Sequence, residues 1–548
     1  FMLLDDHPPL KPWTVKISHS ELVFWRDEGG VVHFEGGGDL DFARGLGYSH
    51  AMDRLTQMIM QAVAGRGKLA EMMSDTPRAR KMDYQFRSLD FEGIANRLWN
   101  EMDRGSGEAG QECKVFLQAY ADGVNAYLNS YPFPFRTTLE LALTGIWDLE
   151  WHPIDSLVTA GIFSYAGLGQ LQDNVESFVL QLLTAPHVDL DRMKTLFAPH
   201  LKEVDEELVG ILKQLKYTDT GVIPLELWPE GKSTECAGES CAPASAAAPG
   251  AGAGAAGQAP PDSAAVDDAV PSFGASNNWA VHGSLTKTGG ALLAMDPHLE
   301  VSRLPSAFVE AVFHDRRADL GCREDREEDH RASATQNGYL MGITLPGFPC
   351  MAFGRNKNVG WSVTYGVMDQ IDYFVEEVRD GKVLRDGFWA PISGHRVTYR
   401  PKNGPEMELT FFKTPNGVLQ TGNHTMEHPS LLEDGYYLSK AWSWQHYLQA
   451  DHLRGLLQRP RWCDIREAMG RNVTSGMGPG GRTKIGAVNA TASVPSVDQV
   501  TPFLEGNGKT SLSSTPITAN WVLADSAGEI AYLQTGHLPL RTGSGLVP

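Results

Sequence analysis

One serine stands where the character of the chain changes, and its position could give it an unusual chemistry. Ser276 follows the small pair Gly274-Ala275 at the end of a long run rich in Ala, Gly, Pro and Ser. If the Ala275–Ser276 bond were cut, Ser276 would begin a polypeptide and carry both a hydroxyl and a free α-amine. An α-amino group has a pKa of about 7.7–8.0, so part of it is neutral near pH 7 and can accept the hydroxyl proton. The alternative interpretation is that Ser276 merely caps a helix or strand after a linker.

A terminal serine of this kind is suited to attack on an amide bond. The amide carbonyl is stabilised by resonance, so a hydroxyl attacks it only when a base takes the proton and donors hold the developing oxyanion. A peptide nitrogen is not basic, so the Ala275–Ser276 bond must be broken before Ser276 can work in this way. A flexible spacer that ends in small residues leaves the Ala275–Ser276 bond open to approach without steric hindrance.

The elements on the two sides of the spacer differ in type. Residues 14–35 alternate between apolar and polar around Gly29-Gly30, which predicts a β-hairpin. A helix is expected next, with Asp39 as its N-cap, and a mostly helical pattern continues to about residue 215. After Ser276, short runs rich in β-branched and aromatic residues are separated by Gly and Pro and predict strands.

Composition divides the chain into three segments. We predict a mostly helical segment over 1–234, a spacer or linker over 235–275 and a strand-rich segment over 276–548. The spacer has almost no large apolar residue, so burial cannot offset the entropy of ordering it.

The charge and hydropathy of the 548-residue chain argue against some partners. It carries 47 Lys plus Arg against 67 Asp plus Glu, a formal charge of −20 with His neutral, which disfavours nucleic acid and anionic membranes. We expect no membrane span, because no apolar run approaches about 18 residues. The first residues show no signal-peptide pattern, and this leaves the compartment open. The six cysteines match no zinc spacing; Cys236 and Cys241 could pair.

Short blocks spread over nearly the whole sequence can be compared with known families. They are Trp25-Arg26-Asp27, Gly47 to Leu55, Ser276 to Val281, Asp296-Pro297-His298-Leu299, Pro346-Gly347-Phe348-Pro349, Phe353-Gly354-Arg355-Asn356, Gly360-Trp361, Asn520-Trp521 and Arg541. In content and spacing they resemble the penicillin acylase family of N-terminal-nucleophile hydrolases. That family includes penicillin, cephalosporin and acyl-homoserine-lactone acylases.

The resemblance implies a fold and a reaction. The fold would be α+β, a four-layer αββα sandwich with a helical N-terminal region. The chain would be a zymogen that cuts itself at Ala275–Ser276 and stays together as a heterodimer of its own products. It would hydrolyse a small N-acyl amide, such as a β-lactam antibiotic or a quorum signal, to a carboxylic acid and an amine. A periplasmic or extracellular location is suggested by the resemblance alone.

The resemblance also implies catalytic roles. Ser276 would be the nucleophile, and the oxyanion would be held by the backbone N–H of Tyr365 and the side-chain amide of Asn520. His298 would lie beside the nucleophile and steady its protonation state, and Arg541 would favour the neutral α-amine. Ordinary alternatives stay open, namely a buried structural amide for Asn520, a structural role for His298 and a surface ion pair for Arg541.

By the same resemblance, Leu299, Phe353 and Tyr365 border the substrate cleft. Leu299 and Phe353 are apolar and could equally belong to the core. They suggest an apolar acyl group without identifying it.

A calcium ion is the one cofactor that the resemblance implies, and no organic cofactor is expected. Its ligands would be Glu176, Asp369, Asp372 and the backbone carbonyl of Ile371. Hard oxygen ligands from separate segments suit Ca²⁺ in a structural role. The alternative is that these carboxylates simply lie on solvated loops.

The sequence stops at Pro548, soon after Arg541, whereas the family continues well beyond this point. We therefore expect either a further polypeptide that completes the strand-rich region or a fragment of a longer protein. Two other classes of function remain open. One is an uncleaved or degenerate family member that serves as a binding or scaffold protein. The other is a large extracellular binding protein in which the spacer joins two domains.

Overall fold

The computed structural model describes most of two long stretches and three short strands. The first stretch covers 11–217 except 105–106, 133–135, 148, 166–169, 186–188, 197–200 and 202–203. The second covers 275–442 except 282, 299–306, 317–337, 357–358, 366–370 and 386. The short strands cover 487–488, 519–525 and 530–535.

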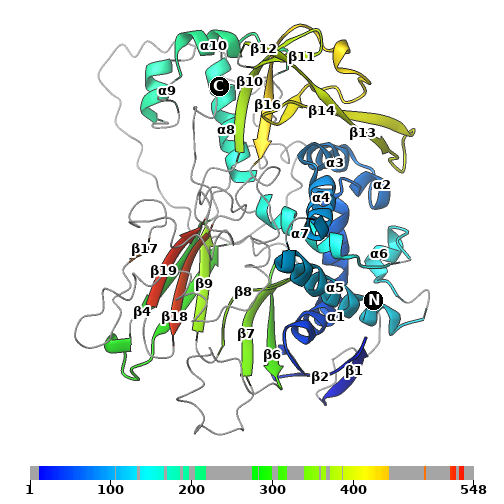
Figure 1. Cartoon of the computed structure of the whole chain (residues 1–548), viewed down its shortest axis with the longest axis vertical. Helices are drawn as coiled ribbons and strands as arrows, with labels where there is room; N and C mark the ends of the chain where they lie inside the picture. Colours follow the sequence, from blue (N-terminus) through cyan, green and yellow to red (C-terminus); the bar gives the residue numbers. More distant parts are fainter. Residues whose placement is uncertain are drawn as a thin grey trace, which may run out of the picture.

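One large sheet unites strands from both sides of the spacer (Figure 1). Its ten described strands lie in the order β1 (Trp13–Ile17), β2 (Ser20–Arg26), β3 (Val32–Gly36), β6 (Val309–Asp315), β7 (Gly338–Leu345), β8 (Phe348–Asn356), β9 (Val359–Tyr365), β18 (Ala519–Asp525), β19 (Ile530–Thr535) and β17 (Ala487–Val488). The pairs β3–β6 and β17–β19 are parallel, and the other neighbours are antiparallel.

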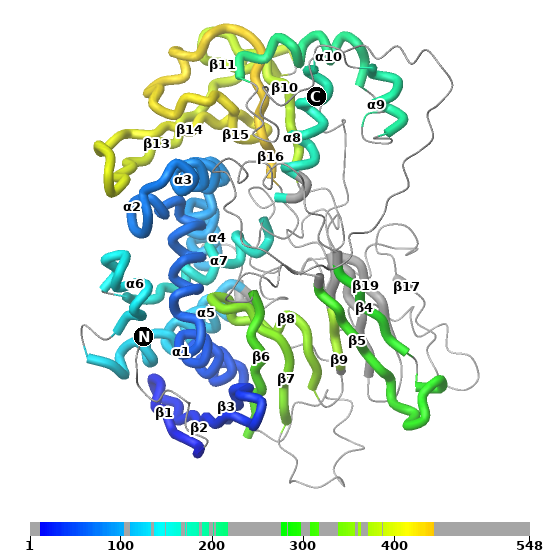
Figure 2. The backbone as a smooth tube through the Cα atoms, turned by 180° about the vertical axis from the view of Figure 1, so that it is seen from behind, coloured from blue at the N-terminus to red at the C-terminus, as the bar shows by residue number. Residues whose placement is uncertain are grey.

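Two further sheets contain the remaining described strands. The seven-stranded sheet has the order β12 (Phe388–Pro391), β11 (Lys382–Arg385), β10 (Ile371–Arg379), β16 (Gly435–Trp442), β15 (Val418–Gln420), β14 (Met407–Lys413) and β13 (Ser393–Tyr399). The third sheet is a hairpin of β4 (Ala275–Val281) and β5 (Leu292–His298). Figures 1 and 2 show the seven-stranded sheet at one end of the molecule and the ten-stranded sheet at the other.

The helices lie beside both large sheets (Figure 2). They are α1 (Asp39–Gly65), α2 (Leu69–Met72), α3 (Pro77–Leu89), α4 (Phe91–Arg104), α5 (Gly107–Asn129), α6 (Leu139–Leu143), α7 (Pro153–Ser164), α8 (Gln170–Thr184), α9 (Leu190–Leu196) and α10 (Glu206–Leu212). Their range confirms the mostly helical pattern expected up to about residue 215.

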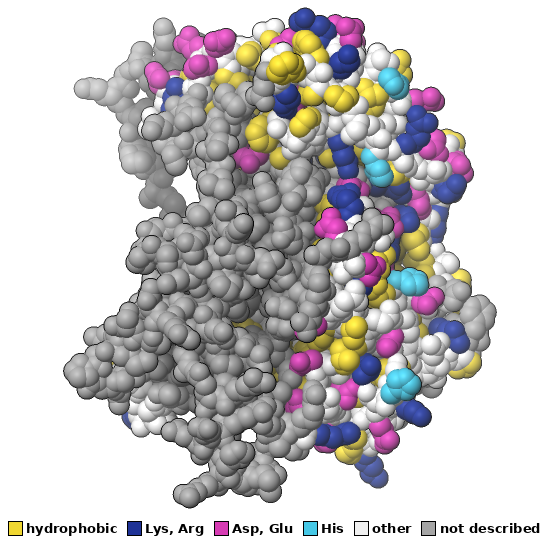
Figure 3. Space-filling view, viewed as in Figure 1, with side chains coloured by type: hydrophobic (Ala, Val, Ile, Leu, Met, Phe, Trp, Pro, Cys, Tyr) yellow, Lys and Arg dark blue, Asp and Glu magenta, His cyan; other side chains and the backbone are white. Residues whose placement is uncertain are grey.

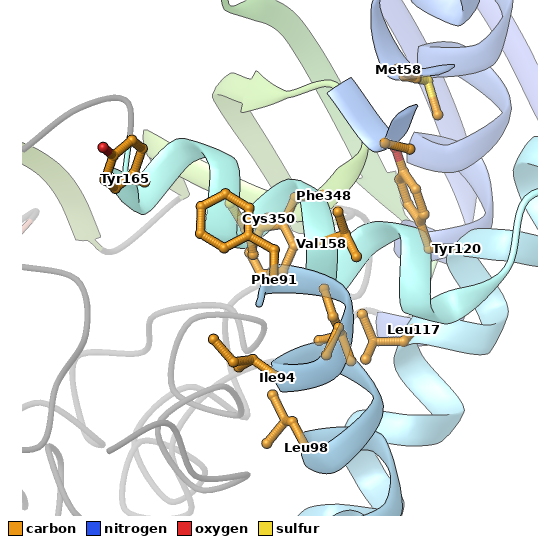
Figure 4. Close-up of a cluster of buried hydrophobic side chains, with 14 of the residues drawn as sticks. Met58, Phe91, Ile94, Leu98, Leu117, Tyr120, Val158, Tyr165, Phe348 and Cys350 are labelled. Atoms are coloured by element: carbon orange, nitrogen blue, oxygen red, sulfur yellow. The ribbon is translucent and has the colours of Figure 1, made fainter. Parts of the chain in front are cut away.

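Close helix packing builds the core beside the ten-stranded sheet. α1 and α5 approach so closely that a β-carbon on Gly47 or Gly123 would overlap the backbone of the other helix. Figure 4 shows the buried side chains where α1, α4, α5, α7 and β8 meet. Burial of such apolar surface contributes about 25 cal/mol per Å² and is the main favourable term in folding.

Alternation along the strands gives the ten-stranded sheet two different faces. On β6, the ring of Phe313 packs 5.6 Å from that of Phe42 in α1, whereas Val312 lines a cavity beside β5. Successive side chains point to opposite faces of a sheet, so the helices and the β4–β5 hairpin lie on opposite faces. The described residues thus form an α+β arrangement of a helical layer, a sheet and a second strand layer. The second helical layer of the expected four-layer sandwich stays a prediction.

Two local expectations can be compared with the structure. The predicted hairpin over 14–35 is confirmed and extends to three antiparallel strands, β1 to β3. The prediction that Asp39 is the N-cap of the first helix is wrong. Gly38 holds that position at φ 95°, and its N–H donates to Asp315, so Asp39 becomes the first helical residue. A left-handed φ suits glycine best, which explains the shift by one residue.

The described surface is mixed in charge. Lys and Arg side chains lie among Asp and Glu side chains on the helical side of the face in Figure 3. None of the described helices combines the length and apolar character that a membrane crossing requires.

Candidate active site

Ser276 lies near the start of β4, beside the end of β5. In the antiparallel register Ser276 pairs with Pro297, and Ala275 pairs with His298. The hairpin therefore brings the predicted nucleophile next to the strand end that carries His298. Ser276 is partly buried.

The two predicted oxyanion donors lie on neighbouring strands of the ten-stranded sheet. β9 ends at Tyr365 and β18 begins at Ala519, and these two residues are register partners. Asn520 pairs with Thr364, so Tyr365 and Asn520 are one residue out of register. Only the backbone of Tyr365 and Asn520 is described, and the backbone is what the predicted role of Tyr365 uses.

The hairpin packs against β9 and β18, and the direction of its strands decides which ends meet. Ala291 and Leu292, at the start of β5, line one cavity together with Gly360, at the start of β9. β5 and β9 therefore run in the same direction, so His298 and Tyr365 lie at the same end. Figure 1 shows β4 beside β9, β18 and β19. The backbone positions of Ser276, His298, Tyr365 and Asn520 are thus gathered at one end of two packed strand layers.

The cavity between β5 and strands β6 to β9 has a volume of about 800 Å³. Phe353 lines it, is 9% exposed, and packs edge-to-face on Phe308 with 5.2 Å between ring centroids. The cavity lies within the range of about 300–1,000 Å³ that is usual for ligand pockets. Phe353 therefore belongs to the core and borders a cavity, and its role in an acyl pocket stays a prediction.

Both apolar and polar side chains line the cavity. Its lining includes the apolar residues Leu293, Met295, Val312, Ile343 and Trp361, and the polar residues Asp27, His33 and Arg355. Sequence reasoning missed Leu293 and Met295. The available signal was their spacing of two along a strand, which puts both on one face.

An unpredicted polar cluster includes two of these lining residues, Asp27 and His33. Nδ1 of His33 lies 3.0 Å from Nε2 of His314, and Nε2 of His33 lies 3.3 Å from the carboxylate of Asp27. Trp25 packs on both imidazole rings. Burial, and then the neighbouring His33, lower the pKa of His314. These side chains come from β2, β3, β6 and the β2–β3 turn, so the cluster joins the two sides of the spacer.

Part of the predicted calcium site can be located. α8 carries Glu176 and packs against β10, which begins with Ile371 and Asp372. A hydrogen bond of 3.1 Å between the hydroxyls of Ser177 and Tyr373 joins the residues next to Glu176 and Asp372. The carboxylates and the backbone carbonyl on these two elements are oxygen ligands, the type that a hard cation such as Ca²⁺ prefers. Within the described part of the chain, no cluster of three or more His, Cys, Asp or Glu side chains could hold a metal.

Three predicted residues, Leu299, Asp369 and Arg541, lie outside the described residues. Their roles in the acyl pocket, the calcium site and the α-amine environment stay predictions. The predicted boundary between the segments 1–234 and 235–275 also lies outside the described residues.

Known proteins resemble this chain over most of its length. The penicillin acylase 2 proenzyme of Pseudomonas sp. (strain SE83) is 29% identical over 403 residues, covering 73% of this chain and 43% of that protein. The acyl-homoserine lactone acylase QuiP of Pseudomonas aeruginosa is 25% identical over 403 residues, covering 72% and 40%. The penicillin G acylase of Escherichia coli is 24% identical over 474 residues, covering 80% and 50%. The chain thus spans half or less of the length of these relatives.

Among solved structures, the thermostable penicillin G acylase of Alcaligenes faecalis superposes with a TM-score of 0.26 at 22% identity. This superposition covers 34% of this chain and 93% of that one. The family model of penicillin amidase matches residues 24–477. Because this match extends over most of the sequence, the chain belongs to the penicillin amidase family.

Proposed function

We propose that this chain is an N-acyl amide hydrolase whose nucleophile is Ser276, released by self-cleavage of the Ala275–Ser276 bond. The observation that carries the proposal is the meeting of strand ends, which gathers the backbone positions of Ser276, Tyr365 and Asn520. Membership of the penicillin amidase family supports amide hydrolysis as the class of reaction.

The reaction would proceed in two steps. The hydroxyl oxygen of Ser276 attacks the acyl carbon while its proton passes to the α-amine of the same residue. The tetrahedral intermediate collapses, the C–N bond breaks, and the leaving amine takes that proton, which leaves an ester on Ser276. Water then adds to the ester in the same way, and the carboxylic acid departs.

The remaining residues would stabilise charge. The backbone N–H of Tyr365 and the side-chain amide of Asn520 donate to the oxyanion, and loss of one such donor typically reduces kcat about 10²- to 10³-fold. His298 follows Pro297, the register partner of Ser276. It would orient the hydroxyl or the α-amine of Ser276. Arg541 would keep that amine in its neutral, basic form.

The acyl group would enter the cavity between the two strand layers. Its apolar walls beside Phe353 favour an apolar acyl chain. By the family resemblance, Leu299 and Tyr365 would also border the acyl group. The relatives named above are penicillin acylases and acyl-homoserine lactone acylases. The amine product would accordingly be a β-lactam nucleus or a homoserine lactone.

The architecture around the site extends the proposal. The two products of self-cleavage would form a heterodimer in the periplasm or outside the cell, and its fold would be the four-layer sandwich. Glu176, Asp369, Asp372 and the carbonyl of Ile371 would hold Ca²⁺, whose charge would tie the helical part to β10.

The test is N-terminal sequencing and turnover of Ser276→Ala and Ser276→Cys. Wild-type protein should yield a fragment that starts Ser-Asn-Asn-Trp and should hydrolyse acyl-nitroanilides. Ser276→Ala should stay uncut and lose activity by roughly 10⁴-fold or more, because both the nucleophile and its amine are lost.

Ser284→Ala is the matched control, because this exposed serine lies in the turn of the same hairpin, at the end away from Ser276. It should be cut and active like the wild type. Full activity in uncut protein, or in Ser276→Ala, would contradict the proposal. Such a result would leave a binding or scaffold role as the better interpretation.

A further inference from the structure

The carboxylate of Asp173 is buried in the first turn of α8. It is 5% exposed and accepts from the ammonium of Lys440, at 2.8 Å to one oxygen and 2.9 Å to the other. It also accepts from the hydroxyls of Tyr165, at 2.7 Å, and Tyr373, at 2.5 Å. A buried charge that is paired and hydrogen-bonded at both oxygens is stable, but it becomes costly when a partner is removed.

These donors come from elements that are far apart in the sequence. Tyr373 and Lys440 are direct cross-strand partners on β10 and β16, and both reach Asp173 from the same face. Tyr165 is the C-cap of α7. Ser177, one turn after Asp173 on α8, hydrogen-bonds to Tyr373 as well. A single carboxylate therefore fixes α7, α8 and the first residues of β10 relative to one another.

Protonation keeps these donors in place at ordinary pH. Burial, and then the charge of Asp173, raise the pKa of Tyr165 well above the usual value, so its hydroxyl keeps its proton. Burial alone would lower the pKa of Lys440, but the ion pair with Asp173 outweighs burial and the net pKa is raised. Tyr165 and Lys440 are therefore donors to Asp173 throughout the ordinary pH range.

The start of β10 is tethered to the candidate active site. β9 ends at Tyr365, whose backbone N–H is the proposed oxyanion donor, and β10 begins at Ile371. A chain extends at most about 3.3–3.6 Å per residue, so Ile371 lies within roughly 20 Å of Tyr365 along this connection. Tyr373 follows Ile371 by two residues. Five residues join these two strand ends, so the position of the start of β10 limits where the end of β9 can lie.

We propose that Asp173 is a positioning residue for the acylase site. By holding Tyr373 and Lys440 it fixes the start of β10, and through the tether it fixes the end of β9 that carries the oxyanion donor. This inference rests on the proposed function for its catalytic readout, but its structural part can be tested without activity.

The experiment compares two substitutions that remove the same group. Tyr373→Phe and Tyr165→Phe each delete one buried hydroxyl that donates to Asp173, but only Tyr373 lies on β10. Because small displacements of catalytic groups reduce the rate steeply, we expect Tyr373→Phe to lower kcat roughly 10- to 100-fold with KM unchanged. Tyr165→Phe should keep kcat within about twofold of wild type, and Asp173→Asn should lose at least as much kcat as Tyr373→Phe. Equal kcat losses in the two phenylalanine variants, or none in either, would overturn the proposal.

Hydrogen–deuterium exchange supplies the readout that is independent of turnover. Tyr373→Phe and Asp173→Asn should speed exchange in 359–365 and 371–379, whereas Tyr165→Phe should speed it in 153–164 only. If wild-type protein hydrolyses no acyl amide but this exchange pattern holds, the proposed function fails and the positioning role of Asp173 stands. If exchange in 359–365 is unchanged in Asp173→Asn, the positioning role fails even in an active enzyme.

Discussion

Acid should destabilise this protein through one buried histidine, His50 of α1. A chain of hydrogen bonds fixes its tautomer. The N–H of Gly347 donates to the hydroxyl oxygen of Tyr120 at 2.9 Å, and that hydroxyl donates its own proton to Nδ1 of His50 at 2.8 Å. The hydroxyl of Thr344 donates to the carbonyl of Val309 at 2.7 Å, so its oxygen accepts from Nε2–H of His50 at 2.8 Å. A second proton on His50 would face the hydroxyl proton of Tyr120.

The size of the effect follows from the pKa of His50. Burial, and then the positive charge of Arg54, lower this pKa to about 3 in the folded chain, whereas an unfolded chain has about 6.5. Protons therefore bind the unfolded chain preferentially between these values. Stability from His50 is complete above about pH 6.5, falls by about 1.4 kcal/mol per pH unit below it, and stops falling near pH 3. At pH 4.5 the loss is roughly 2–3 kcal/mol.

The assay is urea unfolding of wild type and His50→Gln at pH 7 and pH 4.5. The glutamine variant should be less stable at pH 7, because it breaks the chain of hydrogen bonds. Glutamine cannot take up the second proton. The difference between the free energies of unfolding of the two proteins should therefore narrow by roughly 2–3 kcal/mol at pH 4.5. His19→Gln removes an exposed imidazole and controls for the substitution itself. A gap that stays the same at both pH values would refute this account of His50.

Four shorter predictions follow from other parts of the structure. Gly123→Ala should lower the free energy of unfolding by about 1–3 kcal/mol, because its β-carbon would overlap the carbonyl of Arg44. Gly210→Ala, in a helix with nothing near its β-carbon, should raise it by up to about 1 kcal/mol in the same urea titration. Phe353→Leu should shift the ratio of kcat/KM values toward bulkier acyl groups by about tenfold across a panel of acyl-nitroanilides, because it enlarges the cavity. Calcium should raise the melting temperature of wild type in a chelator titration, and Glu176→Gln should lose most of that rise, since it removes one proposed oxygen ligand.

Local periodicity made much of the fold predictable. The alternation over 14–35 predicted the strands β1 to β3, and the apolar spacing after Asp39 predicted α1. Both patterns are predictive because their periods show which side chains face the core. The N-cap was misassigned because the cap is chosen by a tertiary contact, the bond from Gly38 to Asp315. A residue 277 positions away leaves no local trace in the sequence.

Only part of the candidate site could be predicted, because contacts between residues far apart in the sequence are again not visible in local patterns. Motif content indicated Ser276, Tyr365 and Asn520 as candidates, but it said nothing of the register that gathers their strands. Asp173 and Lys440 could not be found in this way, because they lie 267 residues apart in the sequence and meet only when α8 packs on β10 and β16. The spacing of residues on a partly apolar helix does not show whether one of its aspartates is buried and paired or lies in solvent.

The pairing of strands across the spacer explains how self-cleavage could activate the protein without dividing it. β3 lies between β2 and β6, so a chain cut before Ser276 would still hold β3 and β6 together by parallel hydrogen bonds. Phe34 and Phe313 pack 5.3 Å apart across this junction, and exposing each ring would cost about 1.5–3 kcal/mol. Separating Lys440 from Asp173 would leave a buried charge unpaired, at about 3–5 kcal/mol. Cleavage can therefore release the α-amine of Ser276 while the two products stay assembled, as catalysis by an N-terminal residue requires.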